Sequence, residues 1–332
     1  MTGTEISMDG ILDAAQALLG VVTRTPLLES YEANERLGGR LLIKAEALQR
    51  TGAFKIRGAY NRIRHLSAAE RHLGVVTYSS GNHALGVACA AKLLGTSALI
   101  VMPDDAPQAK RAAAERLGAT IVLFNRDTEN SDAIVTRLCA ETGRINVPPS
   151  GDALVHAGAG TAAIELLVQA QAAGARIDTA LIPCGGGGLA AATAFVMRAR
   201  SPATQVYAAE PTLFDDTRRS LLAGKRVHNP KGQRTICDAI MTPTPNETTF
   251  ALNRRLLAGG VVATDDEVRD AMRFAYQMFK IIVEPGAAVG LAALLSGRVD
   301  IKDKTVATIV TGGNIDQARF CALLSSTPTN GA

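Results

Sequence analysis

The sequence predicts an α/β protein with two doubly wound, open parallel sheets and flanking helices. Short β-branched runs alternate with alanine-rich stretches of helical length along most of the chain, a pattern typical of parallel sheets covered by helices. The 332 residues are 47% hydrophobic and 20% charged. This is enough apolar material for one large or two medium domains with buried cores.

The first alternating series lies within residues 74–148, which we expect to form a small domain. Its strands are predicted at residues 75–78, 98–101 and 120–124, and its helices at 82–94, 108–117 and 131–141. Gly118 follows the second of these helices and is expected to end it.

The second series, together with the N-terminal residues, is expected to form a large domain from residues 1–73 and 149–332. Its strands are predicted at 179–183, 205–209 and 305–310, and its helices at 160–173, 189–200, 265–279 and 285–296. Thr264 is the expected N-cap of the third helix. Residues 224–249 are rich in Pro, Gly and Asn and predict a long ordered loop with a functional role.

Composition argues against several classes of protein. The net charge is only +4 with scattered basic residues, aromatics are 4% and Trp is absent, so we expect no nucleic-acid binding. Residues 179–197 form the longest weakly polar run but contain four glycines, so no membrane span is expected. There is no signal-peptide pattern, and the five cysteines lack metal or disulfide spacing. These features predict a cytoplasmic protein.

Lys55 lies between Phe54 and Ile56 in a glycine-flanked, largely apolar segment, residues 51–59. A lysine there tends to be desolvated, and desolvation disfavours its charged form. A neutral amine is a nucleophile that forms a Schiff base with an aldehyde such as pyridoxal 5′-phosphate. The sequence therefore suggests Lys55 as a covalent catalyst.

Glycine motifs follow predicted strands, where ligands of open parallel sheets bind. Gly185, Gly186, Gly187 and Gly188 precede a helix, and their N–H groups can cup a phosphate; the alternative is a flexible tight turn. Thr311 precedes Gly312 and Gly313 after the last strand. Its hydroxyl could hydrogen-bond a pyridine nitrogen.

A third motif, Ser79-Ser80-Gly81-Asn82-His83, joins a strand to a helix. Its N–H groups could bind a substrate carboxylate, Ser80 could transfer a proton, and Asn82 could donate to a phenolic oxygen. The competing interpretation is a helix cap with a structural His83.

Glu210, Asp216 and the carbonyl of Phe214 lie close together in sequence after a strand. Oxygen ligands of this kind suit Mg²⁺ or Ca²⁺, although the carboxylates could instead cap a helix. Glu284 precedes a glycine–alanine helix and could lie near a cofactor ring or cap that helix.

Taken together, these motifs resemble the fold-type II pyridoxal phosphate enzymes, in particular the serine/threonine dehydratase and serine racemase group. The resemblance runs from Arg24-Thr25-Pro26-Leu27 to Thr311-Gly312-Gly313-Asn314 and is most specific at residues 54–59, at 80–83 and in the tetraglycine. It implies a tryptophan synthase β-like fold, with the cofactor on the large domain and a substrate loop on the small one.

The resemblance also implies a role for each residue. Lys55 binds the cofactor covalently, Phe54 packs against it, Asn82 contacts its 3′ oxygen, the four glycines hold its phosphate and Thr311 meets its pyridine nitrogen. Glu210, Phe214 and Asp216 match the metal site of racemase-like members. The implied reaction is β-elimination from a β-hydroxy amino acid such as threonine or serine, giving a 2-oxo acid and ammonia, and a homodimer is implied.

Departures from the family pattern leave alternatives open. Ser80 stands where many threonine dehydratases have alanine, which makes amino-acid racemisation possible. Residues 146–152 and Ala159 differ from the usual pattern at the cleft, so threo-3-hydroxyaspartate or a hydroxyectoine-derived amino acid are candidate substrates. We expect no regulatory C-terminal domain. A β-replacement synthase is less favoured, because such enzymes share the fold but usually differ around the lysine and the asparagine loop. A binding protein without turnover is less favoured, because Lys55, the tetraglycine and Thr311 are intact.

Overall fold

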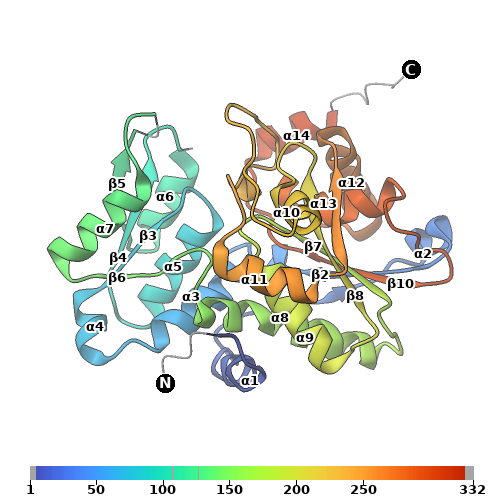
Figure 1. The fold of residues 1–332 in the computed structure, drawn as a ribbon, viewed down its shortest axis with the longest axis horizontal. Coiled ribbons are helices and arrows are strands. Elements are labelled where there is room, and N and C mark those ends of the chain that lie inside the picture. Colours follow the sequence, from blue (N-terminus) through green and yellow to red (C-terminus); the bar gives the residue numbers. More distant parts are fainter. Residues whose placement is uncertain (1–4, 107, 126, 326–332) are drawn as a thin grey trace.

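A computed structural model describes residues 5–106, 108–125 and 127–325, and its strands form two sheets in adjacent units (Figure 1). The larger sheet has the order β1-β2-β10-β7-β8-β9. Its strands are Leu27–Leu28, Arg40–Ala45, Thr305–Val310, Thr179–Pro183, Gln205–Pro211 and Gly259–Ala263, in that order. All neighbours are parallel except β1 and β2. This confirms the predicted parallel α/β class.

Helices cover both faces of the larger sheet because successive side chains of a strand point to opposite faces. Leu41 and Ile43 of β2 belong to a core cluster with residues of α12 (Asp265–Phe279) and α13 (Pro285–Leu295). Leu42 packs in a second cluster with residues of α8 (Ala153–Ala172) and α9 (Gly188–Arg200). The helices of this unit are α1 Met8–Ala17, α2 Tyr31–Leu37, α8 Ala153–Ala172, α9 Gly188–Arg200, α10 Asp216–Ala223, α11 Glu247–Leu256, α12 Asp265–Phe279, α13 Pro285–Leu295 and α14 Gln317–Ser325.

The smaller sheet has the order β5-β4-β3-β6, with all strand pairs parallel. Its strands are Thr120–Phe124, Ala98–Pro103, Val75–Tyr78 and Ile145–Asn146, in that order, and its helices are α4 Ala68–Leu73, α5 Asn82–Leu93, α6 Gln108–Arg116 and α7 Ser131–Thr142. Val75 packs towards α5 and Val76 towards α7, so this sheet is also doubly wound.

Helix α3, Lys55–Arg64, lies between the two units. Ile56 and Ile63 pack in the core cluster of the smaller sheet, while the opposite side of α3 contacts α8. The two helices approach closely at Gly58 and Gly158: a Cβ at Gly158 would lie 2.3 Å from the carbonyl oxygen of Arg57. The division of the chain at 73/74 and 148/149 stays a prediction.

Helix α8 is longer than the predicted helix 160–173, because it begins at Ala153. Asp152 is its N-cap and accepts a hydrogen bond from the Val155 N–H. Gly158 and Gly160 are helical here, because glycine is needed for close packing rather than for a turn. By length and composition α8 could cross a membrane, but 61% of its most apolar window is buried in the protein, which is typical of a core helix.

Candidate active site

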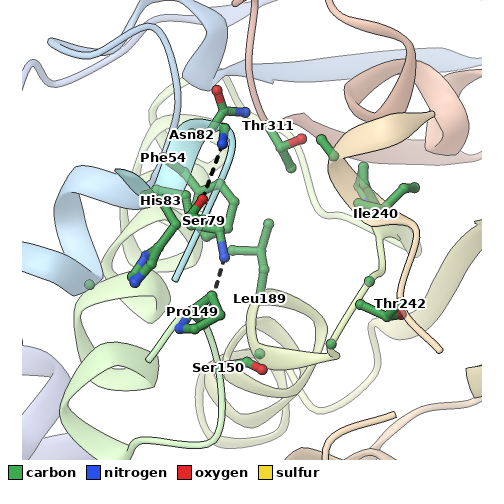
Figure 2. A pocket seen from close by; sticks show the side chains of 18 of the residues that line it. Phe54, Ser79, Asn82, His83, Pro149, Ser150, Leu189, Ile240, Thr242 and Thr311 are labelled. Carbon is green, nitrogen blue, oxygen red and sulfur yellow. Dashed lines mark hydrogen bonds between the residues drawn. The ribbon is translucent and has the colours of Figure 1, made fainter. Parts of the chain in front are cut away.

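A cavity of about 390 Å³ lies between the two units and collects the predicted cofactor and substrate residues. Its lining includes Phe54, Lys55, Ser79, Ser80, Gly81, Asn82, His83, Gly185, Gly186, Gly187, Gly188, Glu284 and Thr311. In the view of Figure 2, Asn82 and Thr311 lie at one end of the pocket and Ser150 and Thr242 at the other. Segments far apart in the sequence therefore meet in one pocket.

Lys55 is the first residue of α3 and is only partly accessible from the pocket. Its Nζ donates a hydrogen bond to the Pro149 carbonyl at 3.0 Å and lies 5.2 Å from the centre of the Phe54 ring. Burial lowers the pKa of Lys55 to about 8, because charge is disfavoured where water is excluded. A useful fraction of the amine is therefore neutral near physiological pH.

The segment Ser79–His83 precedes and opens α5. Gly81 is the N-cap and offers no side chain to the first turn, so the first N–H groups of α5 suit an anion at the pocket. The Gly81 N–H itself donates to Ser79 Oγ at 3.1 Å. The competing interpretation of a serine side-chain cap is therefore wrong.

His83 is almost fully buried, and its Nε2 lies 2.9 Å from the Val147 carbonyl oxygen. A carbonyl only accepts, so Nε2 carries the proton and Nδ1 is left as an acceptor. Burial, with a smaller contribution from nearby Lys55, lowers the pKa of His83 to about 3. The ring is therefore neutral and fixed in one tautomer.

Asn82 and Glu284 are joined at the same end of the pocket. The Asn82 Nδ2 donates to Glu284 Oε1 at 2.5 Å, and Asn314 Nδ2 donates to Asn82 Oδ1 at 2.8 Å. Burial raises the pKa of Glu284 to about 7. Glu284 is the N-cap residue of α13, as one of the two alternatives expected, but its side chain makes no capping hydrogen bond and is bonded to Asn82 instead.

The tetraglycine forms the other end of the pocket, between β7 and α9. Gly187 has φ +88°, a conformation that strongly favours glycine, and a Cβ there would lie 2.6 Å from Asn253 Nδ2. A Cβ at Gly186 would lie 2.6 Å from Ser150 Oγ. The Thr249 hydroxyl holds the loop by donating to the Gly186 carbonyl at 2.6 Å. The loop is therefore held in one conformation, with no side chains between its backbone and the pocket.

Glu210 and Asp216 lie outside the pocket lining and are fully buried. Glu210 accepts hydrogen bonds from the N–H groups of Thr217 and Arg218 at 2.8 and 2.7 Å. Burial, and then the charge of Asp216, raises the pKa of Glu210 to about 8, and burial raises that of Asp216 to about 6. Phe214 lies between them in sequence and is also buried. Among the described residues, no group of three or more His, Cys, Asp or Glu could hold a metal.

The sequence reasoning missed several pocket residues. Ser150 and His156 lie beside the tetraglycine, and Lys110, Asp238 and Thr242 also line the cavity. The His156 Nε2 accepts from the Gly151 N–H at 3.0 Å and so holds the loop that carries Pro149. Ser150 lies in residues 146–152, which differ from the family pattern, and Asp238 and Thr242 lie in the loop 224–249, for which a functional role was predicted. These two signals could have identified the three residues. His156 and Lys110 had no such signal.

Comparison with known proteins identifies the family. A family model described as "Pyridoxal-phosphate dependent enzyme" matches residues 18–312. The chain belongs to this family. This confirms the resemblance seen in the sequence.

Individual relatives cover nearly the whole chain. An L-threo-3-hydroxyaspartate ammonia-lyase from Saccharomyces cerevisiae is 39% identical over 317 residues, which are 95% of this chain and 95% of the relative. A serine racemase from Dictyostelium discoideum is 36% identical and covers 96% of this chain and 98% of its own. The crystal structure of a threonine deaminase from T.th. superposes with a TM-score of 0.88 at 39% identity, covering 93% of this chain and 99% of the deaminase.

The pocket fits the cofactor of this family. An aldehyde forms a Schiff base with an amine, and Lys55 contributes an amine to the lining of the cavity. A phosphate requires N–H donors, and the tetraglycine leaves space that a Cβ at Gly186 or Gly187 would fill. The dimensions and donors of the cavity therefore suit pyridoxal 5′-phosphate.

Proposed function

We propose that the protein is an ammonia-lyase that eliminates water from a β-hydroxy L-amino acid and releases a 2-oxo acid and ammonia. One observation carries this proposal. Lys55 lines the same cavity as the tetraglycine loop and the Ser79–His83 segment, and the hydrogen-bond partner of its amine is a backbone carbonyl. A lysine so placed is available as nucleophile and base.

The chain's own residues divide the work. The four glycines hold the phosphate, Phe54 packs against the ring, and Thr311 donates to the pyridine nitrogen. One N–H of Asn82 donates to Glu284, which leaves the second for the phenolic oxygen. N–H groups and hydroxyls of Ser79–His83 bind the substrate carboxylate.

The bound cofactor supplies an electron sink for the electrons left at Cα. The Lys55 amine removes the Cα proton, and the electron pair of that C–H bond forms the Cα–Cβ double bond as the bond from Cβ to the hydroxyl breaks. The hydroxyl leaves as water with the proton that Lys55 took up. The enamine product then hydrolyses to the 2-oxo acid and ammonia. The names of the lyase and deaminase relatives support this assignment.

Racemisation is the second candidate, and Ser80 favours it. Its side chain lines the pocket with Lys55, and a racemase needs acid/base groups on both faces of Cα. The serine racemase relative supports this alternative. Ser80→Ala is expected to abolish racemisation and leave elimination.

We also propose that Glu210, Asp216 and the Phe214 carbonyl bind Mg²⁺ or Ca²⁺. Two buried carboxylates with raised pKa values gain stability from a cation between them. Adding Mg²⁺ to chelator-treated protein is expected to raise the melting temperature of wild type and not of Glu210→Gln. If the melting temperature of wild type is the same with and without Mg²⁺, Glu210 is only a helix cap.

The finer expectations on assembly and location are also proposals. Exposed apolar side chains, such as Leu19 and Leu222, support a homodimer, which sedimentation velocity tests. Free thiols at all five cysteines are consistent with the reducing cytoplasm. We propose a small amino acid as the binding partner, and we propose no binding to nucleic acid or to a membrane.

The deciding experiment measures 2-oxo acid release by the cofactor-loaded protein over L-serine, D-serine, L-threonine, threo-3-hydroxyaspartate and hydroxyectoine-derived amino acids. Release from a β-hydroxy L-amino acid supports the elimination. Lys55→Ala should abolish release, and Lys302→Ala, at an exposed position, is the matched control. No release from any substrate, with L-serine converted to D-serine, would overturn the lyase in favour of the racemase.

A further inference from the structure

An ion pair at the pocket connects the two units and has no part in the proposed elimination. Lys110 on α6 and Asp238 in the short helix η2, Asp238–Ile240, both line the cavity. The Lys110 Nζ lies 3.3 Å from Asp238 Oδ2. Helix α6 belongs to the smaller unit and η2 to the larger one, so the pair joins the two units across the cavity that both residues line.

Asp238 has a second cationic partner in its own unit. Arg319 on α14 approaches the same Oδ2 at 3.2 Å and is also held by the Ile236 carbonyl at 3.0 Å. Two cations therefore share one carboxylate, and this cluster of three side chains has a net charge of +1. Lys110 can move away from Asp238 without leaving that carboxylate unpaired.

The position of Lys110 in its helix adds to the positive charge at this end of the cavity, which Asp238 partly offsets. It lies in the first turn of α6, which contains no acidic residue. The N-terminal end of a helix carries partial positive charge, so a lysine there is unfavourable unless an anion faces it. Asp104 and Asp105 precede the helix but are exposed and do not line the cavity.

The remaining pocket cations cannot take this role. Burial lowers the pKa of His83 to about 3 and that of His156 to about 4, so both imidazoles are neutral near pH 7. Lys55 is required for the chemistry. Among the described lining residues, Lys110 is therefore the cation available to an anionic substrate side chain.

We propose that Lys110 binds a second carboxylate of the substrate, which makes the natural substrate a dicarboxylic β-hydroxy amino acid. This inference rests on the proposed elimination. When a monocarboxylic substrate is bound, Lys110 stays on Asp238. When a dicarboxylic one is bound, Lys110 pairs with the distal carboxylate and Arg319 continues to neutralise Asp238.

The test compares KM and kcat for threo-3-hydroxyaspartate and L-threonine in wild type, Lys110→Met and Lys110→Arg. Wild type should favour hydroxyaspartate. Loss of a charge-assisted contact should raise its KM about 10- to 100-fold in Lys110→Met, with the KM for threonine changed less than about threefold. Lys110→Arg should keep most of the preference, and Lys302→Met at an exposed site is the control.

Two kinetic outcomes overturn the inference. Equal KM increases for both substrates would make Lys110 only a contact between the units. A wild type that prefers threonine, or an unchanged hydroxyaspartate KM in Lys110→Met, would exclude a role in specificity.

Binding separates this inference from the proposed function. L-Aspartate and L-alanine can be titrated into the cofactor-loaded protein and followed by cofactor absorbance. Lys110→Met should weaken aspartate binding about tenfold or more and spare alanine. If wild type forms no 2-oxo acid, the elimination fails while this titration still decides the role of Lys110. If Lys110→Met weakens the binding of both amino acids equally, or weakens neither, the proposed role of Lys110 is overturned.

Discussion

Two lysines, Lys44 and Lys55, lie close together in the chain but have opposite surroundings. The Lys44 Nζ on β2 donates to the Thr25 carbonyl, Glu165 and Gln169 at 2.6–2.8 Å, which uses all three of its N–H bonds. Lys55 faces the pocket and donates to the Pro149 carbonyl alone among the described residues. Burial lowers both pKa values, but at Lys44 the charge of Glu165 opposes it.

The difference shows how this fold separates a structural lysine from a reactive one. Around Lys44 lies a buried ionic cluster, in which Arg57 pairs with Glu46 at 2.7 Å and with Glu165 at 2.7 Å. The charge of Glu165 favours the charged form of Lys44 against the effect of burial, and three hydrogen bonds hold its amine in place. Arg57 lies two residues after Lys55 on α3, so the same cluster anchors the helix that carries the reactive amine. A carboxylate beside Lys55 would hold it in the unreactive charged form.

Removal of the reactive amine should have the largest effect. Lys55→Ala is expected to lower kcat at least about 10³-fold, because a positioned base and nucleophile is lost. Cofactor binding measured by fluorescence should persist through the phosphate cradle. Activity within about tenfold of wild type would transfer the base to another residue.

Breaking the ionic cluster should affect stability next. Arg57→Met leaves Glu46 buried without its cationic partner, and this should lower the free energy of unfolding by about 3–5 kcal/mol. Urea unfolding measures this loss of free energy. Arg57→Lys, which keeps the positive charge, is the matched variant and should lose less. A loss below about 1 kcal/mol would show that the cluster is not what anchors α3.

Lys44→Met should cost less than Arg57→Met, about 1–3 kcal/mol. Arg57 still pairs with Glu165, and Gln169 still donates to the Thr25 carbonyl. The same urea titration compares the two variants. A larger loss at Lys44 than at Arg57 would reverse their assigned importance.

The pH dependence of Lys55 is the smallest effect. With a pKa of about 8, the neutral fraction of Lys55 should rise about fivefold between pH 7 and pH 8. The rate at which Lys55 forms a Schiff base with added pyridoxal 5′-phosphate, the capture rate, should rise by the same factor. Absorbance of the cofactor follows this rate. Because the pKa of Lys55 is below the ordinary lysine value, the unfolded chain binds more protons above pH 8. The stability of the cofactor-free protein should therefore rise with pH from about 8 to 10. A flat capture rate would contradict the lowered pKa.

Sequence patterns predicted most of the fold because hydrophobic period and strand–helix alternation are local. The strands at 75–78, 120–124 and 305–310 and the helix 265–279 lie where the sequence placed them. Thr264 is the N-cap of that helix as expected. The early start of α8 was missed because Gly158, just before the predicted start at Gly160, disfavours a helix when the sequence is read locally. Gly158 packs closely against α3 and Gly160 against Ile11 of α1, and these contacts are visible only in three dimensions.

The candidate site divides in the same way. Lys55, the tetraglycine and the Asn82 segment have local signatures and proved to line one cavity. Lys110 and His156 have none, because a lone lysine or histidine on a helix has many uses. Their interest comes from partners that the sequence pattern does not reveal, Asp238 and Gly151.

The position of β10 has a consequence for synthesis of the protein. This strand lies between β2 and β7 in the larger sheet, although it is the last strand to be made. The smaller sheet is complete once residue 146 has left the ribosome, whereas the larger one lacks a central strand until residue 310. The β10-facing edge of β2 therefore stays unpaired from residue 45, and that of β7 from residue 183, until residue 310 has been made. Thr311 can join the pocket only after that.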